Sequence, residues 1–106
     1  MITDRVDGIT AIPPLYRTPL PPPPRSVKIE LTARCDFKCF FCATGQKLRD
    51  KADMDSALLR RLLSELRDVG VEEIGMFYLG ESFLFHDLPE TIAFAKDLGF
   101  PYVFLT

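Results

Sequence analysis

Hydrophobic and polar residues recur along this chain with the spacings of strands and helices. From Val27 to Thr32 apolar and polar positions alternate with a period of two, which is typical of a β-strand. Apolar residues then recur at helical spacing between Asp55, which can cap a helix, and Gly70, which can end one. The stripe expected to pack on the sheet consists of Leu58, Leu59, Leu62, Leu63, Leu66 and Val69.

A second strand, a second helix and a third strand follow. Residues from Val71 to Leu79 are apolar on both faces, which favours a parallel strand covered on both sides. Asp87 or a neighbour is expected to cap a helix that has Pro89 in its first turn and that ends at Gly99. The third strand is expected to begin at Tyr102 and to run to Thr106. The inner stripe of the second helix consists of Leu88, Ile92, Ala95 and Leu98.

The order of these elements, β-α-β-α-β, predicts an α/β fold in which right-handed crossovers build a parallel sheet. In the first strand Val27, Ile29 and Leu31 are expected to face the helices, and the polar positions between them to face the opposite side. The carboxyl ends of parallel strands meet at one edge, where α/β folds place their sites. The segments that follow the first and second strands are therefore expected to lie on one rim.

Residues 1–26 have a different composition and form a proline-rich arm before the α/β unit of residues 27–106. Seven of the nine prolines lie between Pro13 and Pro24. Each proline ring fixes φ and removes a hydrogen-bond donor, so this stretch is expected to be an extended polyproline segment. It can serve as a stiff lead-in to the first strand, or as a docking segment for an SH3-like or WW-like partner.

Composition and charge narrow the classes of function. The chain has 106 residues, with 13 basic and 15 acidic side chains and a formal net charge of −2. This balance indicates neither a nucleic-acid footprint nor a basic patch for a membrane surface. No apolar run approaches the length of a membrane span or of a signal-peptide core. We therefore expect a soluble cytoplasmic protein, in which thiols stay reduced and can hold a metal.

The candidate chemistry lies in one short segment that contains all three cysteines. Cys35 and Cys39 have three residues between them, and Cys39 and Cys42 have two. An odd number of cysteines argues against a disulfide framework, and the clustering argues against thiols that simply fill a core. Three thiolates in one loop can hold a four-iron cluster and leave one iron open. The alternative is a structural zinc site in which His86 is the fourth ligand.

The pattern Cys35-x-x-x-Cys39-x-x-Cys42, with the aromatic Phe41 before the last cysteine, resembles the signature of the radical S-adenosylmethionine (SAM) enzymes. The similarity covers residues 27–106. It implies the first part of a partial (β/α)6 TIM-like barrel. It also implies that the three cysteines bind a [4Fe–4S] cluster, that SAM chelates the fourth iron, and that reductive cleavage of SAM yields a 5′-deoxyadenosyl radical, which abstracts hydrogen from a substrate.

The resemblance extends to a second segment after the second predicted strand. The family carries Gly-Gly-Glu-Pro there, which holds the SAM amino group, and this chain has Leu79 followed by Gly80, Glu81 and Ser82. The match departs from the family pattern at the first glycine and at the proline. The resemblance thus implies that Gly80, Glu81 and Ser82 contact SAM, and that Phe41 lies near its adenine.

The resemblance leaves the substrate open, since peptide modification, cofactor synthesis and sugar dehydrogenation all fit. It implies an electron donor such as a flavodoxin or ferredoxin. Because family barrels have more βα units than this chain, the remaining barrel segment is expected in a longer chain or in a partner. No catalytic base is evident, and His86 is expected to be a solvent-exposed residue or to lie at a helix start. The alternative function is a non-catalytic zinc- or iron-binding α/β module that uses the proline-rich arm for partner contacts.

Overall fold

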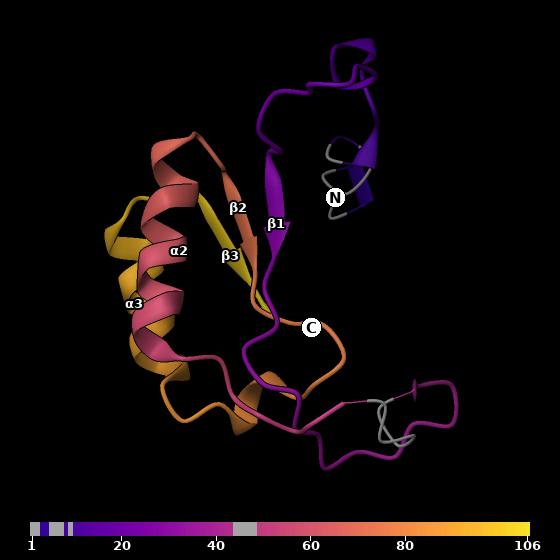
Figure 1. The fold of residues 1–106 in the computed structure, drawn as a ribbon, viewed down its shortest axis with the longest axis vertical. Coiled ribbons are helices and arrows are strands. Elements are labelled where there is room, and N and C mark those ends of the chain that lie inside the picture. The colour runs from indigo at the N-terminus through magenta and orange to yellow at the C-terminus, as the bar shows by residue number, and fades with distance from the viewer. Residues whose placement is uncertain (1–2, 5–7, 9, 44–48) are drawn as a thin grey trace.

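The computed structural model describes residues 3–4, 8, 10–43 and 49–106 and shows strands that alternate with helices (Figure 1). The elements follow the predicted order from residue 26 onward. Their bounds are η1 Pro14–Tyr16, β1 Ser26–Lys28, α2 Ser56–Asp68, β2 Glu73–Gly75, η3 Ser82–Leu84, α3 Leu88–Asp97 and β3 Tyr102–Phe104.

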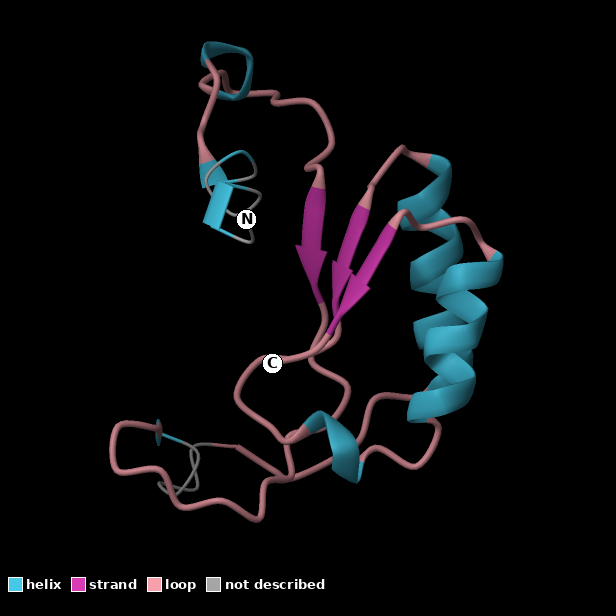
Figure 2. Cartoon of the chain, turned by 180° about the vertical axis from the view of Figure 1, so that it is seen from behind, coloured by secondary structure: helices cyan, strands magenta, loops and turns pink. Residues whose placement is uncertain are grey.

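The three strands form one parallel sheet in the order β1-β2-β3. Val27 pairs with Ile74 and Ile74 pairs with Val103, so the strands run in register from one end to the other. Figure 2 shows α2 and α3 together on one side of this sheet. The predicted α/β fold with parallel βαβαβ units is confirmed.

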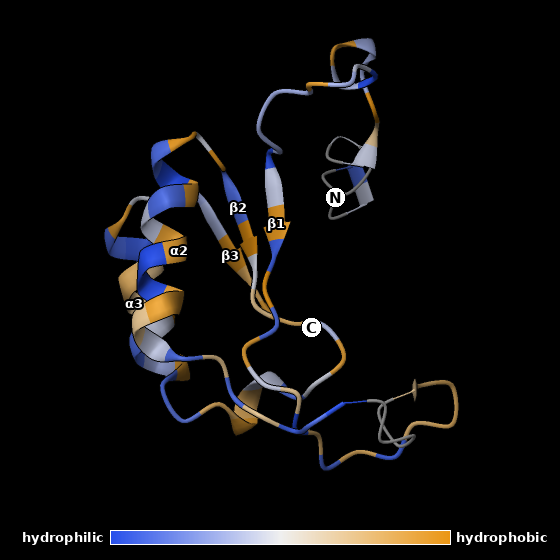
Figure 3. Ribbon diagram, viewed as in Figure 1, coloured by the Kyte–Doolittle hydropathy of each residue, from blue (hydrophilic) through white to orange (hydrophobic). Residues whose placement is uncertain are grey.

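The core lies between the sheet and the two helices. Leu59 and Leu63 of α2 are at most 1% exposed, and they pack in one cluster with Ile74 and Met76 from the second strand region. Each such side chain stabilises the fold by roughly 1.5–3 kcal/mol relative to an exposed one. Both helices carry a hydrophilic and a hydrophobic side (Figure 3), as a helix that packs on one face requires.

Two residues of the stripe predicted for α2 do not belong to the core. Leu58 and Val69 are each 55% exposed. Successive residues of a helix are rotated by about 100°, so Leu58 lies to one side of the face that Leu59 presents to the sheet. Val69 lies after the last helical residue, at the C-cap. The inward face of α2 is therefore narrower than the periodicity predicted.

The first strand is shorter than predicted because its second half leaves the sheet. The Ile29 amide still donates to the Gly75 carbonyl (2.8 Å), but beyond it the chain pairs with residues 52–54 instead. Ala33 donates to Ala52 (2.9 Å) and Met54 donates to Leu31 (2.8 Å). Leu31 and Ile29 remain buried in the core, as predicted for the apolar face of the strand.

The second strand is also shorter than predicted, and the expectation that it is covered on both faces is wrong for its carboxyl end. β2 ends at Gly75, whereas Tyr78 beyond it is 66% exposed and Leu79 is 36% exposed. The helices in the described part of the chain cover one face of the sheet only. Residues 77–79 therefore bend away from the sheet toward the rim.

Helix boundaries follow the predicted signals. The Asp55 side chain accepts a hydrogen bond from the Leu58 amide (2.8 Å), which caps α2. Asp87 precedes α3, but its carboxylate accepts from the Ser56 hydroxyl (2.7 Å) and does not cap the helix. After each helix a glycine has positive φ, 95° at Gly70 and 88° at Gly99. None of the helices described is both long and apolar enough to cross a membrane.

The proline-rich arm extends away from the sheet, from the start of β1 (Figure 1). Its described part contains the short helix η1, and the Arg25 guanidinium donates to the Gly8 carbonyl (2.5 Å). Residues 1–2, 5–7 and 9 of the arm lie outside the described residues. The division into an arm of residues 1–26 and an α/β unit of residues 27–106 stays a prediction.

Candidate functional site

The segments that follow β1 and β2 meet at one rim of the sheet. The Glu81 amide donates to the Arg34 carbonyl (2.8 Å), which joins the turn of residues 79–82 to the residue before Cys35. A Cβ on Gly80 would lie 1.8 Å from the Thr32 carbonyl oxygen and 3.0 Å from that of Arg34. Only glycine fits this approach of two backbones. The turn and the start of the cysteine segment are therefore in direct contact, as the strand-end argument predicted.

Glu30 holds the same turn from the side of the sheet. Its carboxylate accepts from the amides of Leu79 (3.2 Å) and Gly80 (3.0 Å), and it pairs with the Arg49 guanidinium (2.6 Å). Burial of this carboxyl opposes ionisation, but the bonds from Arg49, Gly80 and Leu79 outweigh burial and lower the pKa of Glu30. The backbone of the turn is thus held by a charged acceptor.

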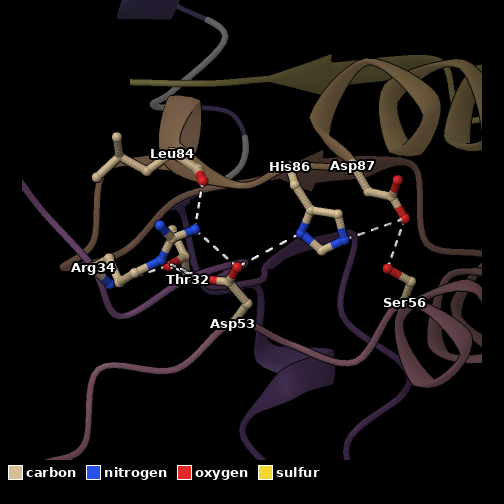
Figure 4. A network of polar contacts seen from close by, with 7 residues as sticks. All are labelled: Thr32, Arg34, Asp53, Ser56, Leu84, His86 and Asp87. Carbon is tan, nitrogen blue, oxygen red and sulfur yellow. Dashed lines mark hydrogen bonds and ion pairs between the residues drawn. The ribbon is translucent and has the colours of Figure 1, made fainter.

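Arg34 and Asp53 form an ion pair at the centre of a polar network (Figure 4). Arg34 donates from Nε to Asp53 Oδ1 (2.9 Å) and from Nη2 to Asp53 Oδ2 (2.8 Å), and Nη2 also donates to the Leu84 carbonyl (2.6 Å). The Thr32 hydroxyl donates to Asp53 Oδ1 (2.6 Å). The hydrogen bonds from Arg34 and Thr32 lower the pKa of Asp53.

His86 lies at the edge of this network and not with the cysteines. Its side chain is 65% exposed, its Nδ1 lies 3.6 Å from Asp53 Oδ2, and its Nε2 lies 4.0 Å from Asp87 Oδ2. His86 also directly precedes the N-cap of α3. It thus occupies the exposed position at a helix start that the sequence analysis expected, and its two ring nitrogens face Asp53 and Asp87.

The three cysteines lie in the segment that leaves the rim. None of them is in a disulfide bond, and the Cys42 amide donates to the Cys39 carbonyl (3.1 Å), which closes a tight turn. Cys39 is exposed, whereas Cys35 and Cys42 are partly buried. Among the described residues no three His, Cys, Asp or Glu side chains are gathered as a metal site. The donor chemistry nevertheless fits an iron–sulfur cluster, because its ligands are cysteine thiolates.

The other predicted cofactor residues have different surroundings. Phe41 is 79% exposed and meets Phe40 edge to face, with ring centroids 5.2 Å apart. Glu81 accepts from the Phe83 amide (3.1 Å) and caps η3. Ser82 is 3% exposed and its hydroxyl donates to the Met76 carbonyl (2.5 Å), which fixes the turn to the end of β2. The roles of Phe41, Glu81 and Ser82 toward SAM stay predictions.

The sequence analysis missed the charged residues that assemble this rim. Alternation identifies Glu30 only as one of the polar positions of the first strand, and no sequence pattern assigns a role to Arg34 or Asp53. The available signal was local: Glu30 lies on the face opposite the core residues, and Arg34 directly precedes the first cysteine. Their pairing partners lie 19 residues away in sequence, so no periodicity reveals them.

The lowered pKa of Asp53 predicts a specific dependence of stability on pH. A carboxyl whose pKa is lowered by folding stabilises the folded state above its unfolded pKa of about 4, and this contribution is lost as the pH falls through the lower folded value. We expect Asp53→Asn to reduce the free energy of unfolding at neutral pH, where the Asp53 carboxyl is ionised in both the folded and the unfolded state. Below about pH 4 the difference from the wild type should shrink. Urea unfolding at a series of pH values measures both.

Glu65→Gln is the matched control for this experiment, since Glu65 pairs with Arg61 on the exposed side of α2. Ion pairs exposed to this degree contribute little, so its effect should be smaller at every pH. A difference between Asp53→Asn and the wild type that grows as the pH falls below about 4 would contradict the assigned cause.

Comparison with known proteins gives sequence relatives and a structural neighbour. This chain is 43% identical over 79 residues to the PqqA peptide cyclase of Xanthomonas euvesicatoria pv. vesicatoria. The matched region covers 74% of this chain and 21% of the relative. The PqqA peptide cyclase of Gluconobacter oxydans is 35% identical over 81 residues, 76% of this chain and 22% of the relative. The chain thus spans about a fifth of the length of these curated relatives. No family model matches.

Among solved structures, the crystal structure of BtrN in complex with AdoMet and 2-DOIA superposes with a TM-score of 0.69. The match covers 76% of this chain and 34% of BtrN, at 19% sequence identity. At that identity the likeness concerns the fold. It extends the βαβαβ unit described above to a protein whose structure was solved experimentally.

Proposed function

We propose that this chain, which belongs to the radical SAM superfamily, is the part of a radical SAM enzyme that binds the cluster and SAM. The observation that carries the proposal is the 2.8 Å hydrogen bond between the Glu81 amide and the Arg34 carbonyl. It joins the segment expected to bind SAM to the segment that contains the cysteines, at the carboxyl end of the parallel strands.

Cys35, Cys39 and Cys42 would hold a [4Fe–4S] cluster through their thiolates, and the family chemistry leaves the fourth iron to the amino and carboxylate groups of SAM. When bound, such a cluster would supply the electron for reductive cleavage of SAM to methionine and a 5′-deoxyadenosyl radical, and this radical would abstract hydrogen from a substrate. The protein contributes the thiolates and the surroundings that tune the cluster. The zinc alternative has less support, because His86 is turned toward Asp53 and Asp87.

The turn after β2 would bind the methionine end of SAM. Gly80 leaves the backbone bare where it passes the Thr32 carbonyl, and Glu81 supplies a carboxylate that can pair with an ammonium group. Ser82 stabilises the turn, because its hydroxyl donates a hydrogen bond to the Met76 carbonyl. Phe41 offers an exposed aromatic face for the adenine.

The relatives support a peptide as the class of substrate, since they are named PqqA peptide cyclases and share 35–43% identity with this chain. BtrN supports the fold alone and adds no substrate. Further parts of the proposal are a flavodoxin or ferredoxin as electron donor and more βα units that complete the barrel. The free edges of β1 and β3 within the described sheet offer places for such units to pair.

Anaerobic reconstitution with iron and sulfide tests this function. We expect a [4Fe–4S] cluster whose electron paramagnetic resonance spectrum, in the reduced state, changes when SAM is added. A reduced cluster whose spectrum SAM leaves unaltered would contradict the proposal. A colourless chain that holds one zinc ion would favour the alternative module.

Glu81→Gln should weaken SAM binding about tenfold and leave the iron content unchanged, because a charge-assisted bond to the SAM amino group is replaced by a neutral one. Glutamine keeps an oxygen that can accept from the Phe83 amide, so the cap of η3 is preserved. Isothermal titration of the reconstituted chain with SAM measures the affinity. Glu72→Gln is the control, since Glu72 is exposed at the opposite end of β2. An equal loss of iron in Glu81→Gln would contradict this division of roles.

A further inference from the structure

Arg34 contacts two segments that are far from it and from each other in the sequence. Its guanidinium binds both carboxylate oxygens of Asp53 (2.9 and 2.8 Å) and the carbonyl of Leu84 (2.6 Å). Its own carbonyl accepts from the Glu81 amide (2.8 Å). Figure 4 shows the side chain lying between Asp53 and the Leu84 carbonyl. One residue thus links the position before Cys35 to the turn expected to bind SAM and to residues 49–54, the segment after the cysteines that we call the strap.

The strap also pairs with the end of the first strand region, where residues 52–54 lie against residues 31–33. We call this pair of segments the neck. Thr32 and Asp53 form an antiparallel bridge, flanked by the hydrogen bonds from Ala33 to Ala52 (2.9 Å) and from Met54 to Leu31 (2.8 Å). The Thr32 hydroxyl reinforces the neck by donating to Asp53 (2.6 Å). The neck therefore holds together the two ends of the segment that contains the cysteines, at one point on the rim of the sheet.

The turn is held against the neck from a second side by Glu30. Its carboxylate accepts from the Leu79 and Gly80 amides and pairs with Arg49 of the returning strap. Glu30 fixes the start of the turn and Arg34 fixes its continuation at Glu81 and Leu84. Both ion pairs join the first strand region to the same strap.

Arginine is suited to this position and lysine is not. The guanidinium is planar and carries five donors, so it can bind a carboxylate with two parallel bonds and still donate to a carbonyl. An ammonium group is a point charge that cannot satisfy Asp53 in this way and reach Leu84 in the same geometry. A change to lysine therefore keeps the charge and removes the side-chain part of the link, whereas the backbone bond from the Glu81 amide to the carbonyl of residue 34 remains.

We propose that Arg34 is a positioning residue that fixes the turn of residues 79–85 against the neck of the cysteine segment, so that SAM and the cluster are held in a fixed relative position. The inference rests on the proposed function for its ligands. The link between neck and turn, by contrast, involves only residues of this chain. Arg34 acts through Asp53, Leu84 and Glu81 and need not touch the reacting atoms.

Two measurements on Arg34→Lys test the proposal. In the chain without cluster, we expect hydrogen exchange of the amides of residues 79–85 to become about tenfold faster, while the amides of α2 keep their rates. In the reconstituted chain, iron content should stay at the wild-type level, while SAM affinity falls about tenfold and the SAM-induced change in the resonance spectrum becomes smaller. Arg61→Lys, in an exposed ion pair with Glu65, is the matched control and should change neither measurement.

Asp53→Asn serves as a second variant, because it weakens the same link from the other side and should give the same pattern. Faster exchange confined to residues 79–85 together with weaker SAM binding would support the proposal. Unchanged exchange in both variants, or an equal increase throughout the chain, would overturn it. A wild-type spectrum that SAM does not alter would contradict the proposed function instead, and the exchange data would still decide whether Arg34 fixes the turn.

Discussion

Cys39→Ala is expected to abolish cluster binding, so that the reconstituted chain contains less than about a tenth of the wild-type iron. The proposed site has three thiolates, and a cluster held by only two protein ligands loses much of the attachment that its thiolate bonds provide. Cys39 is exposed, so removal of its sulfur leaves no cavity in the core and the fold should persist. Iron and sulfide analysis after anaerobic reconstitution measures the loss, and circular dichroism checks the fold.

Lys38→Ala is the control for this variant, because Lys38 is an exposed neighbour in the same segment and carries no thiol. It should retain the full cluster. Wild-type iron content in Cys39→Ala would remove the central premise of the proposed function. The same reasoning applies to Cys35 and Cys42, and a site that tolerates the loss of any one of the three would not be the three-thiolate site proposed.

The order of elements and the location of the site could be predicted from local patterns. Alternation identified the first strand, the spacing of leucines identified α2, and Gly70 and Gly99 marked the helix ends. The rule that parallel strands end at one edge then brought the cysteine segment and the turn at Gly80 to the same rim. Each of these inferences used residues close together in the sequence and needed no knowledge of packing.

The sequence patterns could not predict that the backbone changes its hydrogen-bond partner at the end of the first strand. The first strand region keeps its alternation up to Thr32, but beyond Ile29 its backbone pairs with residues 52–54 and no longer with β2. The same holds for the ion pairs of Glu30 and Arg34, whose partners follow from this pairing. A polar residue in an alternating strand is ordinarily interpreted as solvent-facing, and only the tertiary contact distinguishes a structural carboxylate from a solvated one.

Gly80→Ala is expected to lower the free energy of unfolding by about 3 kcal/mol or to displace the turn, and in either case to eliminate SAM binding. The added Cβ would lie 1.8 Å from the Thr32 carbonyl oxygen and 2.8 Å from its carbonyl carbon. Both atoms belong to the backbone of the neck, which is fixed by its own hydrogen bonds and cannot rotate aside. Urea unfolding measures the stability, and titration with SAM measures the binding.

Two other glycines provide graded controls for this prediction. A Cβ on Gly8 would meet nothing within 4 Å, so Gly8→Ala should change the stability by less than about 0.5 kcal/mol. A Cβ on Gly75 would meet the rings of Phe77 (2.7 Å) and Phe104 (3.0 Å), which are side chains and can shift, so its cost should be intermediate. If Gly80→Ala were as stable as Gly8→Ala and still bound SAM, the close contact between turn and neck would not exist in solution. The contact matters for function as well as for stability, because it is the place where the turn expected to bind SAM touches the neck of the cysteine segment.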